Sequence, residues 1–210
     1  DVEPGCPEKE ARVVPAMLAL SDEVGPERVI WRYDPILLSG AYPKAFHYDA
    51  FERLARRLSG RVAQCTFSFI DMYRNTARSA QELGLRPIET GDMTEMAEKL
   101  SRIARDYGIT LAACAETEDF SRFGIARARC VDPEILMAAS GRALKYRRDK
   151  NQRPACGCAE SVDIGAYNTC PGGCKYCYAN YSPSLLRENL ARRSPDSPLI
   201  QGESRGAHTP

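Results

Sequence analysis

Three short apolar runs, separated by longer stretches of helical periodicity, constrain the fold of this chain most strongly. The runs are RVIWRYDP (28–35), VAQCTFSFID (62–71) and ITLAACAE (109–116), and each ends in polar or charged residues. Runs of this length and composition are typical of buried strands. Because a helix-length stretch lies between consecutive runs, the strands are expected to lie parallel, joined by right-handed crossovers. The sequence therefore predicts an α/β fold made of parallel βα units.

The stretches between these runs are predicted to form helices. Apolar residues recur at helical spacing in 46–58 and 92–107, and a glycine follows each segment. A third helix is predicted to begin at Pro133, with Asp132 as its N-cap. Weaker patterns predict helices over 8–24, where Pro15 interrupts, over 72–83 and over about 183–193.

The predicted strands are too few to close a barrel. A closed eight-stranded barrel needs about 250 residues, and the recognisable strands make less than half of one. Either the sheet is small and open, or the chain is the C-terminal part of a longer barrel. The chain begins with Asp1 rather than Met, which favours the second alternative, and we expect residues 1–144 to be the C-terminal part of a TIM-barrel-like fold. Residues 145–182 are expected to form a Cys-rich metal-binding segment, followed by a short helix and a flexible tail over 183–210.

Charge and hydropathy select no special environment. The 210 residues carry a net charge of +1, which favours neither nucleic acid nor a membrane surface. No apolar run approaches the roughly 18 residues of a membrane span, and the polar, acidic start of the chain does not resemble a signal peptide. We therefore expect a cytoplasmic protein with no membrane partner.

Nine cysteines make metal or redox chemistry the leading expectation. The number is odd and no export signal is present, which argues against a disulfide framework. Cys170, Cys174 and Cys177 form a C-x3-C-x2-C loop, with glycines at 172 and 173 that allow a sharp turn. Zinc sites usually use C-x2-C pairs. Three thiolates this close suit a [4Fe–4S] cluster instead, and they leave one iron open to a small molecule.

Four further cysteines could hold a second cluster or a zinc ion. They are Cys114, Cys130, Cys156 and Cys158. The alternative for Cys114, at the end of an apolar run, is a buried thiol. Cys65 lies in mid-strand and is expected in the core, and Cys6 is expected to have no role.

Polar residues at the ends of the predicted strands form the candidate catalytic site, which consists of Arg32, Asp34, Asp71 and Glu116. Ligands of parallel α/β folds bind at the C-terminal ends of the strands. The planar fork of Arg32 could bind an amino-acid-like or phosphate-bearing ligand. The structural alternative is that Asp34 caps a turn at Pro35 and that Arg32 pairs with Asp71.

The cysteine loop resembles a known motif. The pattern C-x3-C-x-aromatic-C, with Tyr176 as the aromatic residue, resembles the cluster loop of radical S-adenosylmethionine enzymes. CPGGCKYCY is most similar to the spore photoproduct lyase branch of that superfamily. The resemblance implies a [4Fe–4S] cluster on Cys170, Cys174 and Cys177. It also implies S-adenosylmethionine on the open iron and an electron donor for its reductive cleavage. Tyr176 and Asn180 would then contact the cofactor.

A longer resemblance covers most of the chain. The segments that carry it are WRYDPI (31–36), SFIDMY (68–73), CAE (114–116), CVD (130–132), KNQRPACGCAESVDIGAYNTC (150–170) and CKYCYAN (174–180). Together they resemble a family of bacterial and archaeal proteins described only as a domain of unknown function, number eighteen-forty-eight. Members of that family are longer at the N-terminus, where the first strands of a barrel-like fold lie. This chain therefore resembles their C-terminal part.

These observations favour an iron–sulfur protein of the radical S-adenosylmethionine type. Its substrate, a small molecule or a nucleic acid, is left open by the sequence. The alternative from another class is a non-catalytic module whose cysteines bind zinc structurally. Its partner could be a nucleic acid, contacted by the basic stretch KYRRDKNQR (145–153). A thiol redox protein is a third and weaker interpretation.

Overall fold

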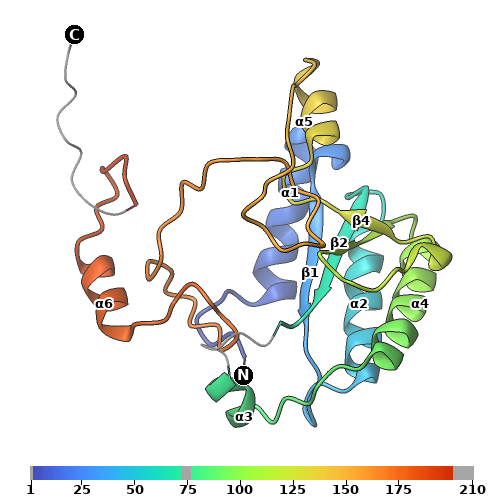
Figure 1. Cartoon of the computed structure of the whole chain (residues 1–210), viewed down its shortest axis with the longest axis horizontal. Coiled ribbons are helices and arrows are strands. Elements are labelled where there is room, and N and C mark those ends of the chain that lie inside the picture. Colours follow the sequence, from blue (N-terminus) through green and yellow to red (C-terminus); the bar gives the residue numbers. More distant parts are fainter. Residues whose placement is uncertain (1, 72–76, 201–210) are drawn as a thin grey trace. The chain divides into compact units, whose positions relative to one another are not determined.

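The structure, a computed structural model, describes residues 2–71 and 77–200 and divides the chain into two compact units (Figure 1). The first, here called the α/β unit, comprises residues 7–71 and 84–161. The second, here called the loop unit, comprises the described parts of 1–6, 72–83 and 162–210. The sequence-based division at residues 144 and 182 stays a prediction.

A four-stranded parallel sheet forms the centre of the α/β unit. Its strands, hydrogen-bonded in chain order, are β1 (Ile30–Ile36), β2 (Gln64–Phe69), β3 (Thr110–Cys114) and β4 (Ala126–Ala128). The predicted α/β class with parallel strands is confirmed, and the first three strands fall on the three predicted runs. The fourth has only three residues, which is too short to show a strand pattern in the sequence. The described strands form an open sheet with β1 and β4 at its edges, so a barrel is not confirmed.

Helices connect the strands where the periodicity predicts them. The helical elements of this unit are η1 (Lys9–Val13), α1 (Val14–Val24), η2 (Pro26–Arg28), α2 (Lys44–Leu58), α4 (Thr90–Asp106), η3 (Ser121–Phe123) and α5 (Pro133–Ser140). The crossover helices α2 and α4 pack against each other beside the sheet (Figure 1). Pro15 stands in the first turn of α1, where its missing N–H breaks no helical bond. The residues before it form the π-helical turn η1.

Side chains of the strands alternate between the two faces of the sheet. Trp31 of β1 points to the helical side and stacks on Phe51 of α2, with ring centroids 4.7 Å apart. Phe67 of β2 is fully buried in the same core. The opposite face carries a row of residues paired in register across all four strands, namely Arg32, Thr66, Ala112 and Ala126. Because successive side chains of a strand point to opposite faces, polar groups in this row do not interrupt the core.

The loop unit contains the helices α3 (Ala77–Glu82) and α6 (Pro183–Ala191). Pro183 occupies the first turn of α6, and the hydroxyl of Ser182 caps the helix by accepting from the N–H of Leu185. A helix here is therefore confirmed. The first part of the predicted helix over 72–83 and the last ten residues of the predicted tail lie outside the described residues. In the described part of the chain, no helix combines the length and the apolar character needed to span a membrane.

Candidate functional site

One candidate site lies on the cysteine loop of the loop unit. Asn168, which is 2 % exposed, closes this loop at its base. Its Oδ1 accepts hydrogen bonds from the N–H groups of Tyr181 and Ser182, at 2.9 and 3.0 Å. Its carbonyl accepts another from Asn189 of α6, at 3.0 Å. Asn168 has a φ of 55°, a left-handed conformation that asparagine tolerates better than most residues. The cysteines between residues 168 and 181 are thereby held in one closed loop.

Three sulfur atoms gather around Gly172 in this loop. The Sγ atoms of Cys6 and Cys174 are 3.5 Å apart. A methyl group placed on Gly172 would lie 3.3 Å from the sulfur of Cys6, 3.4 Å from that of Cys170 and 3.7 Å from that of Cys174. The N–H of Gly172 also points at the sulfur of Cys170, at 3.4 Å. Cys177 follows one turn later, with its N–H bonded to the carbonyl of Cys174 at 3.0 Å. We call Cys6, Cys170, Cys174 and Cys177 the loop site.

The two residues predicted to contact a cofactor lie in the same loop, Tyr176 between Cys174 and Cys177 and Asn180 after Cys177. The hydroxyl of Tyr176 donates to the carboxylate of Glu3. The amide nitrogen of Asn180 donates to the carbonyl of Cys170 at 2.7 Å. The amide oxygen of Asn180 is buried and has no hydrogen-bond partner among the described residues. A buried acceptor without a donor is costly, so this oxygen is suited to a ligand that brings a donor.

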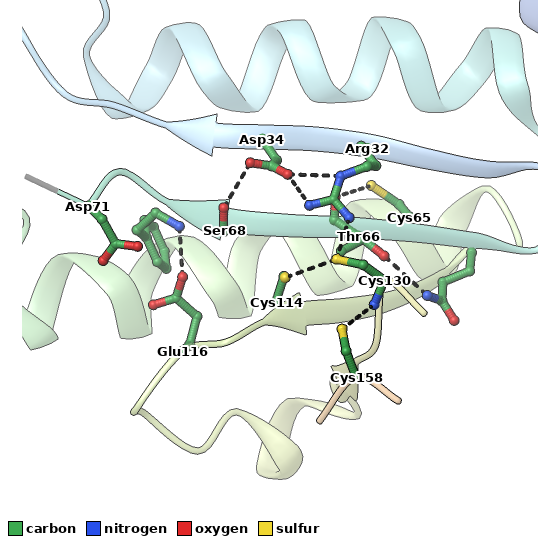
Figure 2. A network of polar contacts seen from close by, with 12 residues as sticks. Arg32, Asp34, Cys65, Thr66, Ser68, Asp71, Cys114, Glu116, Cys130 and Cys158 are labelled. Carbon is green, nitrogen blue, oxygen red and sulfur yellow. Dashed lines mark hydrogen bonds and ion pairs between the residues drawn. The ribbon is translucent and has the colours of Figure 1, made fainter. Parts of the chain in front are cut away.

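A second candidate site lies at the strand ends of the α/β unit (Figure 2). Arg32 of β1 reaches two partners, with Nε 2.9 Å from Oδ2 of Asp34 and Nη1 3.2 Å from Sγ of Cys130. The other carboxylate oxygen of Asp34 accepts from the hydroxyl of Ser68 at 2.9 Å. The fork of Arg32 is therefore occupied by Asp34 rather than open to a ligand. Asp34 does not cap a turn, because β1 continues through Pro35.

Four thiols follow one another beside this arginine. The Sγ atoms of Cys114, at the end of β3, and Cys130 are 3.6 Å apart. The backbone N–H of Cys130 donates to Sγ of Cys158 at 3.1 Å. Burial and the neighbouring thiol of Cys156 raise the pKa of Cys158 above its usual value. All four are free thiols. We call Arg32 and these four cysteines the strand-end site.

Backbone pairing holds the last two of these cysteines in place. The N–H of Ala159 donates to the carbonyl of Val131 at 3.0 Å, which fixes the segment next to Cys130. Arg148 pairs with Ala159 as an antiparallel bridge, and its Nε donates to the carbonyl of Cys156 at 2.9 Å. Arg148, which the sequence assigns to a basic surface stretch, is exposed and also holds the segment that carries Cys156.

The two sites differ in the acidity of their thiols. At the strand ends, the hydrogen bond from Cys114 and the charge of Arg32 lower the pKa of Cys130 to about 5. The same hydrogen bond, together with burial, raises the pKa of Cys114. At the loop site, burial and the neighbouring thiol of Cys6 raise the pKa of Cys174 to about 11. The strand-end site therefore holds a thiolate at neutral pH, whereas Cys174 is protonated at neutral pH.

The remaining predicted site residues lie near each other at the ends of β2 and β3. Glu116 accepts a hydrogen bond from the N–H of Phe69 at 2.8 Å, and burial raises the pKa of Glu116 to about 7. Asp71 pairs with Arg153 of the basic stretch. The sequence-based alternative that Arg32 pairs with Asp71 is therefore wrong. Arg32 forms its ion pair with Asp34, and Asp71 forms one with Arg153.

The structure brings together most of the residues that the sequence singles out, but in two separate groups. The α/β unit gathers Arg32 and Asp34 with Cys114, Cys130, Cys156 and Cys158, and the loop unit gathers Cys170 and Cys174. Sequence reasoning gave Cys6 no role and assigned Arg153 only to the basic stretch, because the partners of both residues are distant in the chain. Cys65 is buried in the core as predicted. Among residues 2–71 and 77–200, no group of three or more His, Cys, Asp or Glu side chains is already arranged to hold a metal ion.

Comparison with known proteins gives one match. No curated protein and no solved structure matches the chain. Its sequence matches the family described as "Domain of unknown function (DUF1848)" over residues 1–179, which is most of its length. The resemblance that the segments around the strands and the cysteines suggest is confirmed. The chain therefore belongs to this family of uncharacterised domains.

Proposed function

We propose that this protein is an iron–sulfur protein whose loop site binds a [4Fe–4S] cluster. The observation that carries the proposal is the gathering of three sulfur atoms, from Cys6, Cys170 and Cys174, around the methyl-sized space at Gly172. Any side chain at position 172 would fill that space, so glycine keeps it free. Thiolates are the donors that iron–sulfur clusters and zinc select, and no hard oxygen ligand competes within this set.

The local chemistry of the loop supports a cluster. The Gly172 N–H directed at the sulfur of Cys170 is a backbone donor of the kind that tunes iron–sulfur sites. Cysteine ligands must be deprotonated to bind a metal, and the bound ion itself draws the thiolates together. We therefore assign Cys170, Cys174 and Cys177 as ligands, in agreement with the C-x3-C-x2-C spacing.

The finer part of the proposal is chemistry of the radical S-adenosylmethionine type. When bound, the cluster would supply the electron for reductive cleavage of S-adenosylmethionine, delivered by an external electron donor. The pattern C-x3-C-x-aromatic-C supports this assignment. The buried, partnerless oxygen of Asn180 supports it as well, because it could accept a hydrogen bond from a cofactor amino group. Tyr176 packs in the same loop and orients the segment through its bond to Glu3.

At the strand ends we propose an auxiliary metal on Cys114, Cys130, Cys156 and Cys158. A series of four adjacent thiols, one of them a thiolate held by Arg32, supports a closed four-thiolate site for zinc or a second cluster. Glu116, with a pKa of about 7, is the group best suited to exchange a proton with a substrate at neutral pH. Asp34 and Asp71 bind the two arginines that shape this polar face. A cytoplasmic location, which keeps thiols reduced, belongs to the same proposal.

We also propose that the α/β unit is the C-terminal part of a barrel-like fold. Consecutive parallel strands in chain order are the arrangement of a βα barrel. The row that contains Arg32 and Thr66 lies on the face away from α2 and α4, which in a barrel is the interior. Both features support the proposal.

The alternative is a non-catalytic zinc module. The contact between the thiols of Cys114 and Cys130, with the sulfur of Cys158 bonded to the N–H of Cys130, favours this module over a thiol redox protein, because closed four-thiolate zinc sites are structural. A nucleic-acid partner for the basic stretch has less support. Two of its five cations, Arg148 and Arg153, are bound within the α/β unit.

The experiment that tests the proposal is anaerobic purification followed by iron, sulfide and zinc analysis of three proteins. These are the natural chain, Cys174→Ala and the control Cys65→Ala, which removes a core thiol outside both sites. About four irons and four sulfides per chain are expected on the loop site, lost in Cys174→Ala and kept in Cys65→Ala. Formation of 5′-deoxyadenosine from S-adenosylmethionine, with dithionite as the reductant, tests the proposed radical S-adenosylmethionine chemistry.

Two results would decide against the proposal. Zinc without iron in anaerobically prepared protein would support the non-catalytic zinc module instead. Iron that persists in Cys174→Ala would show that the loop site is not where the cluster binds.

A further inference from the structure

The segment before the α/β unit is fastened onto the cysteine loop by its backbone. The N–H of Gly5 donates to the carbonyl of Gly172 at 3.0 Å, and the N–H of Lys175 donates to the carbonyl of Val2 at 2.9 Å. The bond between Tyr176 and Glu3 adds a side-chain contact to the same segment. Residues 2–6 are therefore held along the cysteine loop by hydrogen bonds at Gly172 and at Lys175. More than 160 positions of the chain separate this segment from the loop.

The contact is close enough to require glycine at position 5. A methyl group on Gly5 would lie 2.7 Å from the carbonyl oxygen of Pro171 and 2.9 Å from that of Gly172. Both neighbours are backbone atoms, which cannot rotate away as a side chain could. The approach of the two backbones thus depends on the absence of a side chain, and it fixes where the next residue, Cys6, places its sulfur.

The sulfur of Cys6 points into the loop site. It lies 3.5 Å from the sulfur of Cys174 and would be the nearest atom to a methyl group on Gly172. Cys6 is a half-buried free thiol. Its position next to the motif cysteines gives the loop site four thiols, where the C-x3-C-x2-C motif alone provides three.

We infer that Cys6 is the fourth thiolate ligand of the cluster on the loop site. This rests on the proposed function, because it assumes that the motif cysteines hold a [4Fe–4S] cluster. Three thiolates leave one iron without a protein ligand, and that iron is the one most easily lost. A fourth thiolate on that iron closes the site. Binding of Cys6 releases its thiol proton to solvent and involves no change in oxidation state.

Binding of Cys6 to the cluster would also limit the binding of small molecules. Cys6 and the amino and carboxylate groups of S-adenosylmethionine would compete for the same iron. The closed form is then the resting state, and a ligand at the open iron must release Cys6 as a thiol, which takes a proton from solvent. Removing Cys6 should therefore make that iron more accessible to S-adenosylmethionine.

Iron loss under mild oxidation tests the inference. Anaerobically reconstituted natural chain and Cys6→Ala are titrated with ferricyanide, and the [3Fe–4S] signal is followed by electron paramagnetic resonance together with protein-bound iron. The spectrum of Cys174→Ala, which keeps any metal of the strand-end site, is subtracted. We expect the natural chain to keep its four irons and Cys6→Ala to lose one of them, with a several-fold larger [3Fe–4S] signal.

A second variant keeps the thiol and moves it. Gly5→Ala should lift residues 2–6 from the loop and reproduce the behaviour of Cys6→Ala. Gly40→Ala is the matched control, since a methyl group there meets no atom within 4 Å. It should behave as the natural chain does.

The outcomes separate the inference from the proposal on which it rests. If the natural chain binds no iron, the proposed function fails and the inference with it. If the cluster is present, is lost in Cys174→Ala and is as resistant to ferricyanide in Cys6→Ala as in the natural chain, only the inference is overturned.

Discussion

The loop site and the strand-end site both gather cysteines, but different parts of the structure position them. At the strand-end site, Cys114 is the last residue of β3. Cys130 and Cys158 lie on two segments that are hydrogen-bonded to each other beside the sheet. At the loop site, no strand is involved, and the thiols are positioned by a closed loop and an extended segment. The first arrangement inherits the rigidity of a packed core. The second depends on a few backbone hydrogen bonds.

This difference is visible in the charge state of the thiols. The strand-end site contains a guanidinium and holds Cys130 as a thiolate, whereas no cation is bonded to a sulfur of the loop site in the described chain. A site with a thiolate and a counter-charge is prepared for metal or for an electrophile. The raised pKa of Cys174 means that this thiol must lose its proton before it binds a metal, so metal binding through Cys174 should weaken as the pH is lowered.

The largest expected effect is a separation of the two proposed metals by mutation. Cys170→Ala should remove nearly all iron of the loop site and leave the strand-end metal in place. Cys158→Ala should do the reverse, because each site takes its ligands from one unit. Elemental analysis and absorbance spectra of both variants check this. A single variant that empties both sites would show that the two groups of cysteines do not bind independently.

The next effect concerns thiol reactivity in the metal-free protein. At pH 7 iodoacetamide should alkylate Cys130 at least about ten-fold faster than Cys174. The thiolate is the reactive form, and the pKa of Cys130 lies far below that of Cys174. Arg32→Ala should slow the reaction of Cys130 by removing the cation that stabilises its thiolate. Arg28→Ala, at an exposed ion pair, is the control. Peptide mapping by mass spectrometry gives the rates, and equal rates for the two cysteines would contradict the difference between the sites.

A smaller effect is the pH dependence that Glu116 gives to the α/β unit. Its pKa in the folded protein, about 7, lies above the usual value of 4.5, so the folded state binds its proton more tightly than the unfolded state does. The stabilisation is complete below pH 4.5 and is lost as the pH rises through 7. After allowance for solvent screening it is on the order of 2 kcal/mol. The difference in urea unfolding between the natural chain and Glu116→Gln, measured at pH 5 and pH 8, isolates this contribution, and a difference that does not vary with pH would refute it.

The smallest effects compare the helix caps of the two units. Asp132 caps α5 by accepting from the N–H of Glu134 at 2.8 Å, and Ser182 caps α6 through a longer contact to Leu185 of 3.4 Å. Asp132→Ala should cost about 1 kcal/mol, and Ser182→Ala less. Hydrogen exchange of each helix reports the loss locally, with Asp132→Asn and Ser182→Thr as controls that keep a capping oxygen. A larger loss at α6 than at α5 would reverse the expected order.

Much of the α/β unit could be predicted from the sequence because its signals are local. The apolar runs around Trp31, Phe67 and Leu111 indicate buried strands, and the periodicity of 92–107 indicates a helix whose ends match within two residues. The N-cap at Asp132 was likewise readable, since a capping side chain and the N–H it bonds are two residues apart. Strand β4 carried no such signal, because three residues cannot show a period.

The sequence by itself determined the parallel α/β class, the cysteine-rich loop and the polar strand ends. Each is a property of neighbouring residues. Only the tertiary structure decided which of these side chains meet. The tertiary structure places Cys6 beside Cys174, Asp71 beside Arg153, and Arg32 beside Cys130. The physical reason is that such pairs form only when the chain closes over a long separation, and that closure is governed by the packing of the whole fold, which leaves no pattern at either residue.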